Sequence, residues 1–242
     1  MGLVKDQAIV LKKLSYGESD RIVHLFTRTF GKISGIAKGG NKSIRRFMNT
    51  LEPLRIIEIE YFDNRMKGLS KIQNAYVLED FQGIEKDFRK FSVATFFMEV
   101  ADRLTKEKEP NPRLFQILCS TYRELKNTEV TFQKILRLLL DSLEVLGFLP
   151  NFKTCVHCNR EVSNGNKRFF SNQKGGILCE TCARTNLHKT YSPELLTFFS
   201  HLEISELKDE GYLALAFEII ENFIRYHLDV EFKSFKFIKP VP

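Results

Sequence analysis

Apolar residues recur at every second position through the first third of the chain, which is the spacing of half-buried β-strands. The stretch Leu54–Phe62 is the clearest case, because apolar residues there alternate with Glu58 and Glu60. Turn residues separate five such stretches, and the predicted strands are Ala8–Leu11, Arg21–Thr27, Ile33–Ala37, Leu54–Phe62 and Leu69–Ala75. Five short strands in one continuous segment predict a small barrel such as an OB-fold.

From about residue 83 the spacing of apolar residues changes to three and four, which is typical of amphipathic helices. Asn111 and Pro112 are residue types preferred at an N-cap and at the first helical position, so a helix is expected over Arg113–Leu125. Gly147 would end a leucine-rich helix over Phe132–Leu146. The other expected elements are helices over Phe91–Leu104 and Leu213–Leu228, one that starts at Ser192-Pro193, and an extended tail over Phe232–Ile238 that packs on another element. The pattern therefore predicts an α+β protein, with an OB-fold domain over residues 1–80 and a helical domain over residues 81–242.

Four of the five cysteines form two C-x2-C pairs within the predicted helical domain. The pairs are Cys155 with Cys158 and Cys179 with Cys182. The two-residue gap lets both sulfurs of a pair turn toward one ion, and four thiolates complete the tetrahedral shell of a structural zinc site. Short strands over Arg168–Ser171 and Gly176–Leu178 would join at Lys174-Gly175. Residues 151–185 are therefore expected to form a zinc ribbon that holds one Zn²⁺ per chain.

Other uses of these cysteines fit the sequence less well. Two disulfides would need an oxidising compartment, and no secretory signal sequence opens the chain, so a cytoplasmic protein is expected. A redox C-x-x-C motif needs no second pair, and a catalytic zinc ion keeps one coordination position open for water. His157 lies inside the first pair and stays an alternative ligand, although an exposed histidine is the simpler interpretation. The fifth cysteine, Cys119, is expected to be a buried apolar residue of a helix.

The distribution of charge changes the picture more than the net charge of +7 does. Residues 1–75 hold 14 lysines and arginines against 7 acidic residues, whereas the rest of the chain holds 23 of each. Residues 21–51 contain no acidic residue, and their bases are Arg21, Arg28, Lys32, Lys38, Lys42, Arg45 and Arg46. A segregated patch of one sign is the usual footprint of a polyanion, most often nucleic acid, although a solvated basic face without a ligand would give the same pattern.

The segment Lys38–Phe47 is the best candidate for contact with nucleic acid. Its two glycines would let a phosphate approach the backbone, and basic residues flank them. The residues expected to contact DNA are Arg21, Lys38, Lys42, Arg45 and Arg46. Phe47 could stack on a base, although a place in the core fits it at least as well. Tyr16 and Tyr61 are weaker candidates for stacking, and Phe62 is weaker still. Asn41 separates the second glycine from Lys42, so a nucleotide-hydrolysing P-loop is not expected here.

Short motifs occur in one order along nearly the whole chain. In the barrel half they are Ala8-Ile9-Val10-Leu11, Tyr16-Gly17-Glu18-Ser19-Asp20, Thr27 with Gly31-Lys32, Ala37-Lys38-Gly39 and Leu51-Glu52-Pro53. In the helical half they are Pro112-Arg113-Leu114-Phe115, Leu146-Gly147-Phe148-Leu149-Pro150, Gly175-Gly176, Leu178-Cys179 and Lys233-Ser234. Taken together and in this order, they resemble the bacterial RecO family of recombinational DNA repair proteins. Gly40-Asn41 departs from the family, which often has a longer or more basic stretch at this place.

The resemblance implies an N-terminal OB-fold, a helical domain with a zinc-binding insertion, and no catalytic chemistry. It implies a mediator that binds single- and double-stranded DNA and anneals complementary strands. It also implies partners: RecR, with which such proteins help to load RecA on DNA covered by single-strand-binding protein, and the acidic C-terminal tail of that binding protein. The expected location is the cytoplasm, in association with the nucleoid.

Two other classes of function stay open on the residues alone. A zinc-dependent nuclease or deaminase would need an open metal position or a general base beside it, and no H-x-E motif precedes the cysteine pairs. A zinc-ribbon transcription factor would bind specific duplex sequences through the ribbon instead of binding broadly through the barrel.

Overall fold

The computed structural model describes residues 2–63, 68–162, 168–184, 195–196, 198–199 and 207–240. The chain divides into two compact units, Met1–Glu129 and Val130–Pro242. None of the helices within the described residues is long and apolar enough to cross a membrane.

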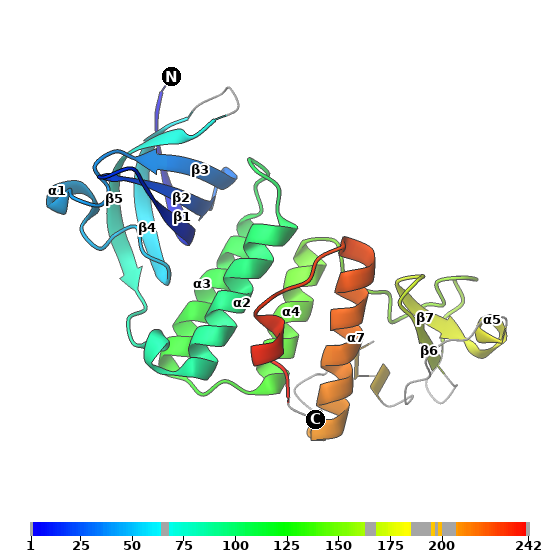
Figure 1. Cartoon of the computed structure of the whole chain (residues 1–242). Helices are drawn as coiled ribbons and strands as arrows, with labels where there is room; N and C mark the ends of the chain where they lie inside the picture. The colour runs from blue at the N-terminus through cyan, green and yellow to red at the C-terminus, as the bar shows by residue number, and fades with distance from the viewer. Residues whose placement is uncertain are drawn as a thin grey trace. The chain divides into compact units, whose positions relative to one another are not determined.

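The first unit begins with a closed barrel of five strands in the order β1-β2-β3-β5-β4 (Figure 1). The strands are β1 (Leu3–Tyr16), β2 (Asp20–Thr27), β3 (Gly31–Ala37), β4 (Arg55–Phe62) and β5 (Ser70–Asp80). Neighbouring strands pair antiparallel except β3 and β5, which pair in parallel. The predicted five-stranded, OB-like barrel is confirmed.

The predicted alternation of buried and exposed side chains along β4 is confirmed. Ile57, Ile59 and Tyr61 are buried in the barrel core, while Glu58 and Glu60 on the other face are partly exposed. Strand β1 is longer than predicted, because after a register shift between Val10 and Lys12 it continues as one arm of a hairpin with β2. The residues of this arm are exposed. Backbone pairing alone extends the strand there, so no buried alternation marks it in the sequence.

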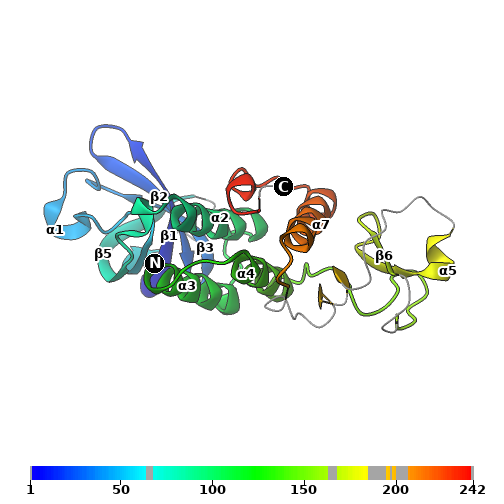
Figure 2. The same cartoon turned by 90° about the horizontal axis from the view of Figure 1, so that it is seen from below.

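The same unit also contains helices. They are α1 (Ile44–Phe47), between β3 and β4, and then the 3-10 helix η1 (Ile84–Lys86), α2 (Phe88–Leu104) and α3 (Pro112–Asn127). Figures 1 and 2 both show α2 and α3 side by side. The predicted cap is confirmed, since the Asn111 side chain accepts a hydrogen bond from the Leu114 backbone N–H at 2.9 Å.

The connection between α2 and α3 is tied to the start of β3. The Lys108 backbone N–H donates to the Lys32 carbonyl at 2.9 Å. A Cβ atom on Gly31 would overlap the Glu109 carbonyl, and Gly31 has φ of +70°, so only glycine fits this close approach. On β2, the Phe26 ring packs against Phe115 of α3 with 6.3 Å between ring centroids. The helices therefore cover one end of the barrel's outer surface.

The second unit contains helices and a two-stranded ribbon. Its elements are α4 (Phe132–Val145), β6 (Arg168–Ser171), β7 (Gly176–Cys179), α5 (Glu180–Ala183), α7 (Glu210–Leu228) and the 3-10 helix η3 (Phe235–Phe237). Helix α4 packs on α7, where the rings of Phe132 and Phe217 lie 6.2 Å apart. The helix expected from Ser192-Pro193 begins outside the described residues.

The prediction of an extended tail was wrong. The Phe237 backbone N–H donates to the Ser234 carbonyl at 3.0 Å, which closes the single turn of η3. This turn brings the Phe235 ring within 6.1 Å of Phe217 on α7. The apolar residues of the tail therefore reach the core through a helical turn instead of by strand alternation.

The boundary between the two compact units differs from the boundary expected between the two domains. The barrel ends at Asp80, close to the expected boundary at residue 80, but its unit continues through α2 and α3 to Glu129. The expected division into a DNA-binding OB-fold domain over residues 1–80 and a helical domain over residues 81–242 stays a prediction.

Candidate nucleic-acid interface and metal centre

The candidate interface lies where the loop after β3 meets the turn between β1 and β2. We call residues 38–43 the barrel loop. The Gly39 backbone N–H donates to Asp20 Oδ1 at 2.8 Å, and the Asn41 backbone N–H donates to the Ser19 carbonyl at 2.8 Å. The Asn41 side-chain amide donates to the Asp20 carbonyl at 3.0 Å. The turn and the loop are therefore held together as one body.

The glycines of the barrel loop shape it instead of presenting backbone to a phosphate. All five backbone N–H groups from Gly39 to Ser43 donate to acceptors within the protein. Gly39 has φ of +73°, and a Cβ on Gly40 would lie 2.8 Å from Arg21 Cβ and 2.9 Å from the Ala37 carbonyl oxygen. Because these donors are already used, the side chains of the loop are what remains for an anionic ligand.

Arg21, one of the expected DNA contacts, lies mostly inside the protein. Its side chain is 17% exposed, with Nε donating to Asn41 Oδ1 at 3.0 Å and Nη1 to Glu52 Oε1 at 3.0 Å. Glu52 also pairs with Lys13. Arg21 thus fixes the position of the barrel loop, and its direct contact with DNA stays a prediction.

The other predicted contacts lie on the barrel loop and on the short helix α1 that follows it. Lys38 and Lys42 are exposed, and neither has an acidic partner within the described residues. Arg46 donates from Nη2 to the Lys38 carbonyl at 2.7 Å, and its guanidinium lies 4.9 Å from the centre of the Phe47 ring. The side chain of Arg45 lies outside those that the structure describes. The loop therefore presents two lysines to solvent beside a partly exposed arginine.

Of the four aromatic residues considered for base stacking, Tyr61 was a wrong choice, and Phe47 takes the place in the core that was its alternative. Phe47 and Tyr61 are each 1% exposed, so neither ring has a face that a base could reach. Both rings are buried in the barrel core, where large apolar side chains are usually found. Tyr16, at the end of β1, is 57% exposed.

The sequence reasoning missed two lysines that the barrel brings near the same region. Lys71 on β5 lies opposite Ile36 of β3, and Lys12 lies on the β1 arm of the hairpin. Both are exposed. Both lysines lie outside the acid-free stretch of the sequence, so the charge pattern did not indicate them. Only the register of β1 and β5, which places both side chains on the outer face, could have identified them.

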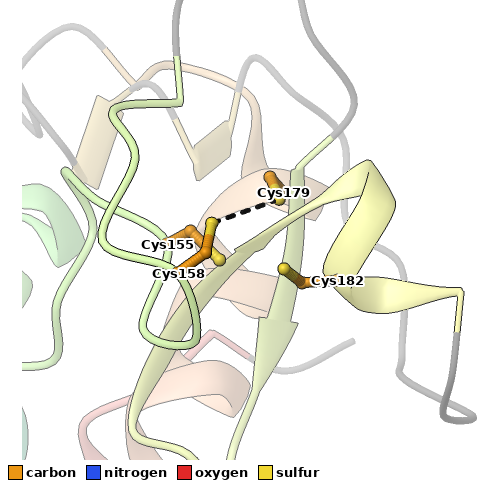
Figure 3. A group of neighbouring side chains, drawn as sticks. All are labelled: Cys155, Cys158, Cys179 and Cys182. Carbon is orange, nitrogen blue, oxygen red and sulfur yellow. Dashed lines mark hydrogen bonds between the residues drawn. The ribbon is translucent and has the colours of Figure 1, made fainter.

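The predicted cysteine quartet comes together in the ribbon (Figure 3). The four Sγ atoms all lie within 4.8 Å of one another, and Cys158 and Cys179 bring theirs to 3.8 Å across the two pairs. Cys155 and Cys158 come from a turn before β6, whereas Cys179 ends β7 and Cys182 lies in α5. The group can hold a metal ion.

Local backbone geometry explains why the first pair turns inward. Asn159 follows the pair with φ of +59°, and its backbone N–H donates to the Cys155 carbonyl at 2.8 Å. This is the left-handed conformation that asparagine tolerates. The Val156 backbone N–H donates to the Ile177 carbonyl at 2.9 Å, which fixes the turn against β7. Gly175, with φ of +74°, closes the β6–β7 hairpin.

The electrostatics of the quartet favour a bound cation. Burial disfavours the Cys155 thiolate, but hydrogen bonds from the backbone of Cys179, Cys158 and His157 outweigh it and lower the pKa to about 6. The hydrogen bond with Cys179, aided by burial, raises the pKa of Cys182 to about 12. Four thiolates at this spacing repel one another, so all four ionise together only around a positive ion. An all-sulfur, four-ligand set suits Zn²⁺.

The remaining candidates fall outside this centre. His157 Nδ1 lies 3.0 Å from Lys174 Nζ, and the group of neighbouring ligand atoms consists of the four cysteines without it. Cys119 is buried in α3, and burial raises the pKa of its thiol to about 11. Cys119 is therefore the buried, neutral residue that the sequence predicted.

Comparisons with known proteins cover the whole of this architecture. Residues 1–81 match the family model "Recombination protein O N terminal", and residues 85–236 match "Recombination protein O C terminal". The chain is 31% identical over 249 residues to the DNA repair protein RecO of a Thermoanaerobacter species, covering 98% of both chains. It is 31% identical over 245 residues to the same protein of a Nocardioides species, covering 98% of this chain and 99% of the relative. Over 76% of its length it is 35% identical to the RecO of Geobacter metallireducens, of which it covers 74%. The chain belongs to the RecO family of DNA repair proteins.

Proposed function

We propose that this protein is a non-catalytic mediator of recombinational DNA repair that holds DNA at the barrel loop. The observation that carries the proposal is the pair of exposed lysines, Lys38 and Lys42, on a loop that Arg21 and Asn41 hold rigidly in place. Membership of the RecO family supports the role in repair.

The physical role of such a loop is to neutralise phosphate charge. Lysines that replace condensed counterions on a nucleic acid release them to solvent, which drives binding without reading the sequence. Annealing of two complementary strands requires that their mutual repulsion be screened, and a basic surface without base-specific contacts serves this. We therefore propose binding to single- and double-stranded DNA, and annealing.

The proposed partners follow from the family. The protein would act with RecR to help load RecA on DNA covered by single-strand-binding protein, and it would contact the acidic C-terminal tail of that protein. The site of action would be the nucleoid in the cytoplasm.

The quartet would hold one Zn²⁺ as a structural ion in this proposal. Four cysteine ligands fill a tetrahedral shell, which leaves no position for a catalytic water molecule. This feature disfavours a zinc-dependent nuclease or deaminase. A transcription factor that reads duplex sequence through the ribbon is disfavoured because the segregated positive charge lies in the barrel half.

Reversal of charge on the barrel loop tests the proposal. The variant Lys38→Glu/Lys42→Glu is expected to bind single-stranded and duplex DNA at low salt roughly tenfold or more weakly, because two phosphate contacts become repulsive. The matched control is Lys86→Glu/Lys106→Glu, which changes the net charge equally at two exposed lysines elsewhere in the same unit. Thermal unfolding should show both variants folded. Equal affinity of the loop variant and the control would overturn the assignment.

A further inference from the structure

The outward face of β1, β2 and β3 carries a row of apolar side chains that the barrel core does not use. In the observed register Leu14 lies opposite Ile22, Ile22 opposite Ile36, and Ile36 opposite Lys71. Residues directly opposite in paired strands share one face of a sheet. The core side of β2 and β3 is formed by the alternate residues, such as Val23 and Ala37. Leu14 is 45% exposed, and the two isoleucines are partly exposed.

The next row on this face leads to the barrel loop. Tyr16 lies opposite Asp20, and Arg21 lies opposite Ala37, so Lys38 continues the row beside Asp20. The Asp20 carboxylate accepts the Gly39 backbone N–H, which ties the row to the loop. The backbone of Tyr16 therefore lies about two strand spacings, or roughly 10 Å, from the backbone of Lys38.

The same face is covered at its other end. Phe26 of β2 is fully buried and packs against Phe115 of α3. One step closer to the loop, Ser34 joins His24 of β2 to Glu107 of the α2–α3 connection, with hydrogen bonds of 3.1 and 2.8 Å. Beyond these residues the face becomes increasingly exposed toward Leu14 and Tyr16. Outward apolar residues are thus used for packing at one end and left accessible to solvent at the other.

Exposed lysines lie on this face and in the barrel loop beside it. They are Lys12, Lys38, Lys42 and Lys71, all exposed and without an acidic partner within the described residues. The acidic residues near them are Asp20, whose Oδ1 is engaged by the Gly39 N–H, Glu18 in the turn, and Glu107, which accepts a hydrogen bond from Ser34 in the same row as Lys12. The face therefore combines an aromatic ring and aliphatic side chains with a rim of positive charge.

We propose that this face is a stacking platform for single-stranded nucleic acid, with a base against the Tyr16 ring, further bases along Leu14, Ile22 and Ile36, and phosphates along the lysines. The proposal rests on the proposed function and deepens it, because it separates two contributions. Lysines attract any nucleic acid, whereas a ring and an aliphatic row gain contact only from bases whose faces are free. In a duplex those faces are already stacked. The platform would therefore set the preference for single strands.

A fluorescent probe can be placed on the platform because the chain contains no tryptophan. In the Tyr16→Trp variant the only indole stands on the platform, and saturation with oligodeoxythymidylate is expected to quench its emission through stacking. Tyr76→Trp is the matched control, since Tyr76 is 50% exposed on β5 of the same barrel and lies opposite Glu58 of β4, outside the row of apolar residues on β1, β2 and β3. Emission of the control should not change. Absence of quenching in the Tyr16→Trp variant when DNA is bound would overturn the platform.

Affinity measurements separate stacking from charge. Tyr16→Ala should weaken binding of oligodeoxythymidylate by roughly 5- to 150-fold, the cost of one lost stacking contact. It should leave unchanged the affinity for a duplex and for an abasic oligomer of equal charge. Tyr16→Phe should restore binding of the single strand, because the ring and not the hydroxyl makes the contact. Equal losses for the oligodeoxythymidylate and the abasic oligomer would contradict stacking.

The outcomes distinguish this inference from the proposed function. If the Lys38→Glu/Lys42→Glu variant has lower DNA affinity while Tyr16→Ala binds all three ligands normally, the platform proposal is wrong. The assignment of phosphate contacts to the barrel loop is then supported. If Tyr16→Ala has lower affinity only for the single strand while the loop variant binds all ligands normally, the platform proposal is supported and the loop assignment is wrong. Failure of the unmodified protein to bind any of the three ligands would overturn both.

Discussion

The four cysteines of the metal centre lie between residues 155 and 182, and their sulfur atoms are all within 4.8 Å of one another. The lysines of the barrel interface come instead from β1, from the loop after β3 and from β5, and no single motif contains them. The first arrangement is closed and local, so its chemistry is directed inward to one ion. The second is open and assembled by barrel closure, so its charge is available to a long polyanion. We therefore propose that the ribbon serves stability and that the barrel binds the ligand.

The largest effect is expected when the metal centre is broken. Cys155→Ser removes a fully buried ligand, so metal content should fall and the ribbon should lose its fold, because binding of structural zinc contributes on the order of 10 kcal/mol. Metal analysis and thermal unfolding would measure both changes. Cys119→Ala, in α3, is the control that should keep its metal. A Cys155→Ser protein with full metal content and unchanged stability would refute the structural role.

The same variant sharpens the comparison between the two regions. If the ribbon is only a structural support, binding of DNA by the barrel should persist in Cys155→Ser at a temperature where the first unit stays folded. Acid should also release the metal, because protons compete for thiolates that the ion needs.

A smaller effect is expected from Gly40→Ala. The added Cβ would press on Arg21 Cβ and on the Ala37 carbonyl, and backbone at this distance must shift. Overpacking of this kind typically costs about 1–3 kcal/mol of unfolding free energy. DNA affinity should fall as well, because the loop and its lysines move. Gly2→Ala is the control, since a Cβ there meets nothing within 4 Å. Denaturant unfolding with normal stability and normal DNA affinity would show that the loop does not need this packing.

The smallest effect is expected from Arg21→Ala, and it distinguishes positioning from contact. Loss of the hydrogen bonds to Asn41 and Glu52 should cost about 1 kcal/mol and loosen the barrel loop. DNA affinity should decrease modestly, and its dependence on salt should stay the same if Arg21 only positions the loop and contacts no phosphate. Arg21→Lys should recover part of the affinity if its charge toward Glu52 is what holds the loop. A reduced salt dependence in Arg21→Ala would instead identify Arg21 as a phosphate contact.

The features predicted best from the sequence are those set by short-range rules. The Cys155–Cys182 spacing, the alternation of β4 and the Asn111 cap each depend on a few neighbouring residues, and each is confirmed. The family resemblance, carried by short motifs in order, is confirmed by matches along the chain.

Features that depend on distant partners were not predictable in the same way. Arg21 has the residue type of a DNA contact, and only its pairing with Asn41 and Glu52 reveals its place in the structure. Phe47 could not be assigned to the core or to the surface until the barrel closed over it. The platform around Tyr16 depends on the register of three strands, which alternation along one strand does not specify.

The central claim is that lysines of the barrel loop neutralise phosphates, and the salt dependence of DNA affinity tests it most directly. The neutral variant Lys38→Gln/Lys42→Gln removes two charges without adding repulsion. In a plot of log affinity against log salt concentration for oligodeoxythymidylate, the negative slope should decrease in magnitude by about 1.4, since each lost phosphate contact contributes about 0.7 to the slope for single strands. The Lys86→Gln/Lys106→Gln control should keep the slope of the unmodified protein. A slope unchanged in the loop variant would contradict the account.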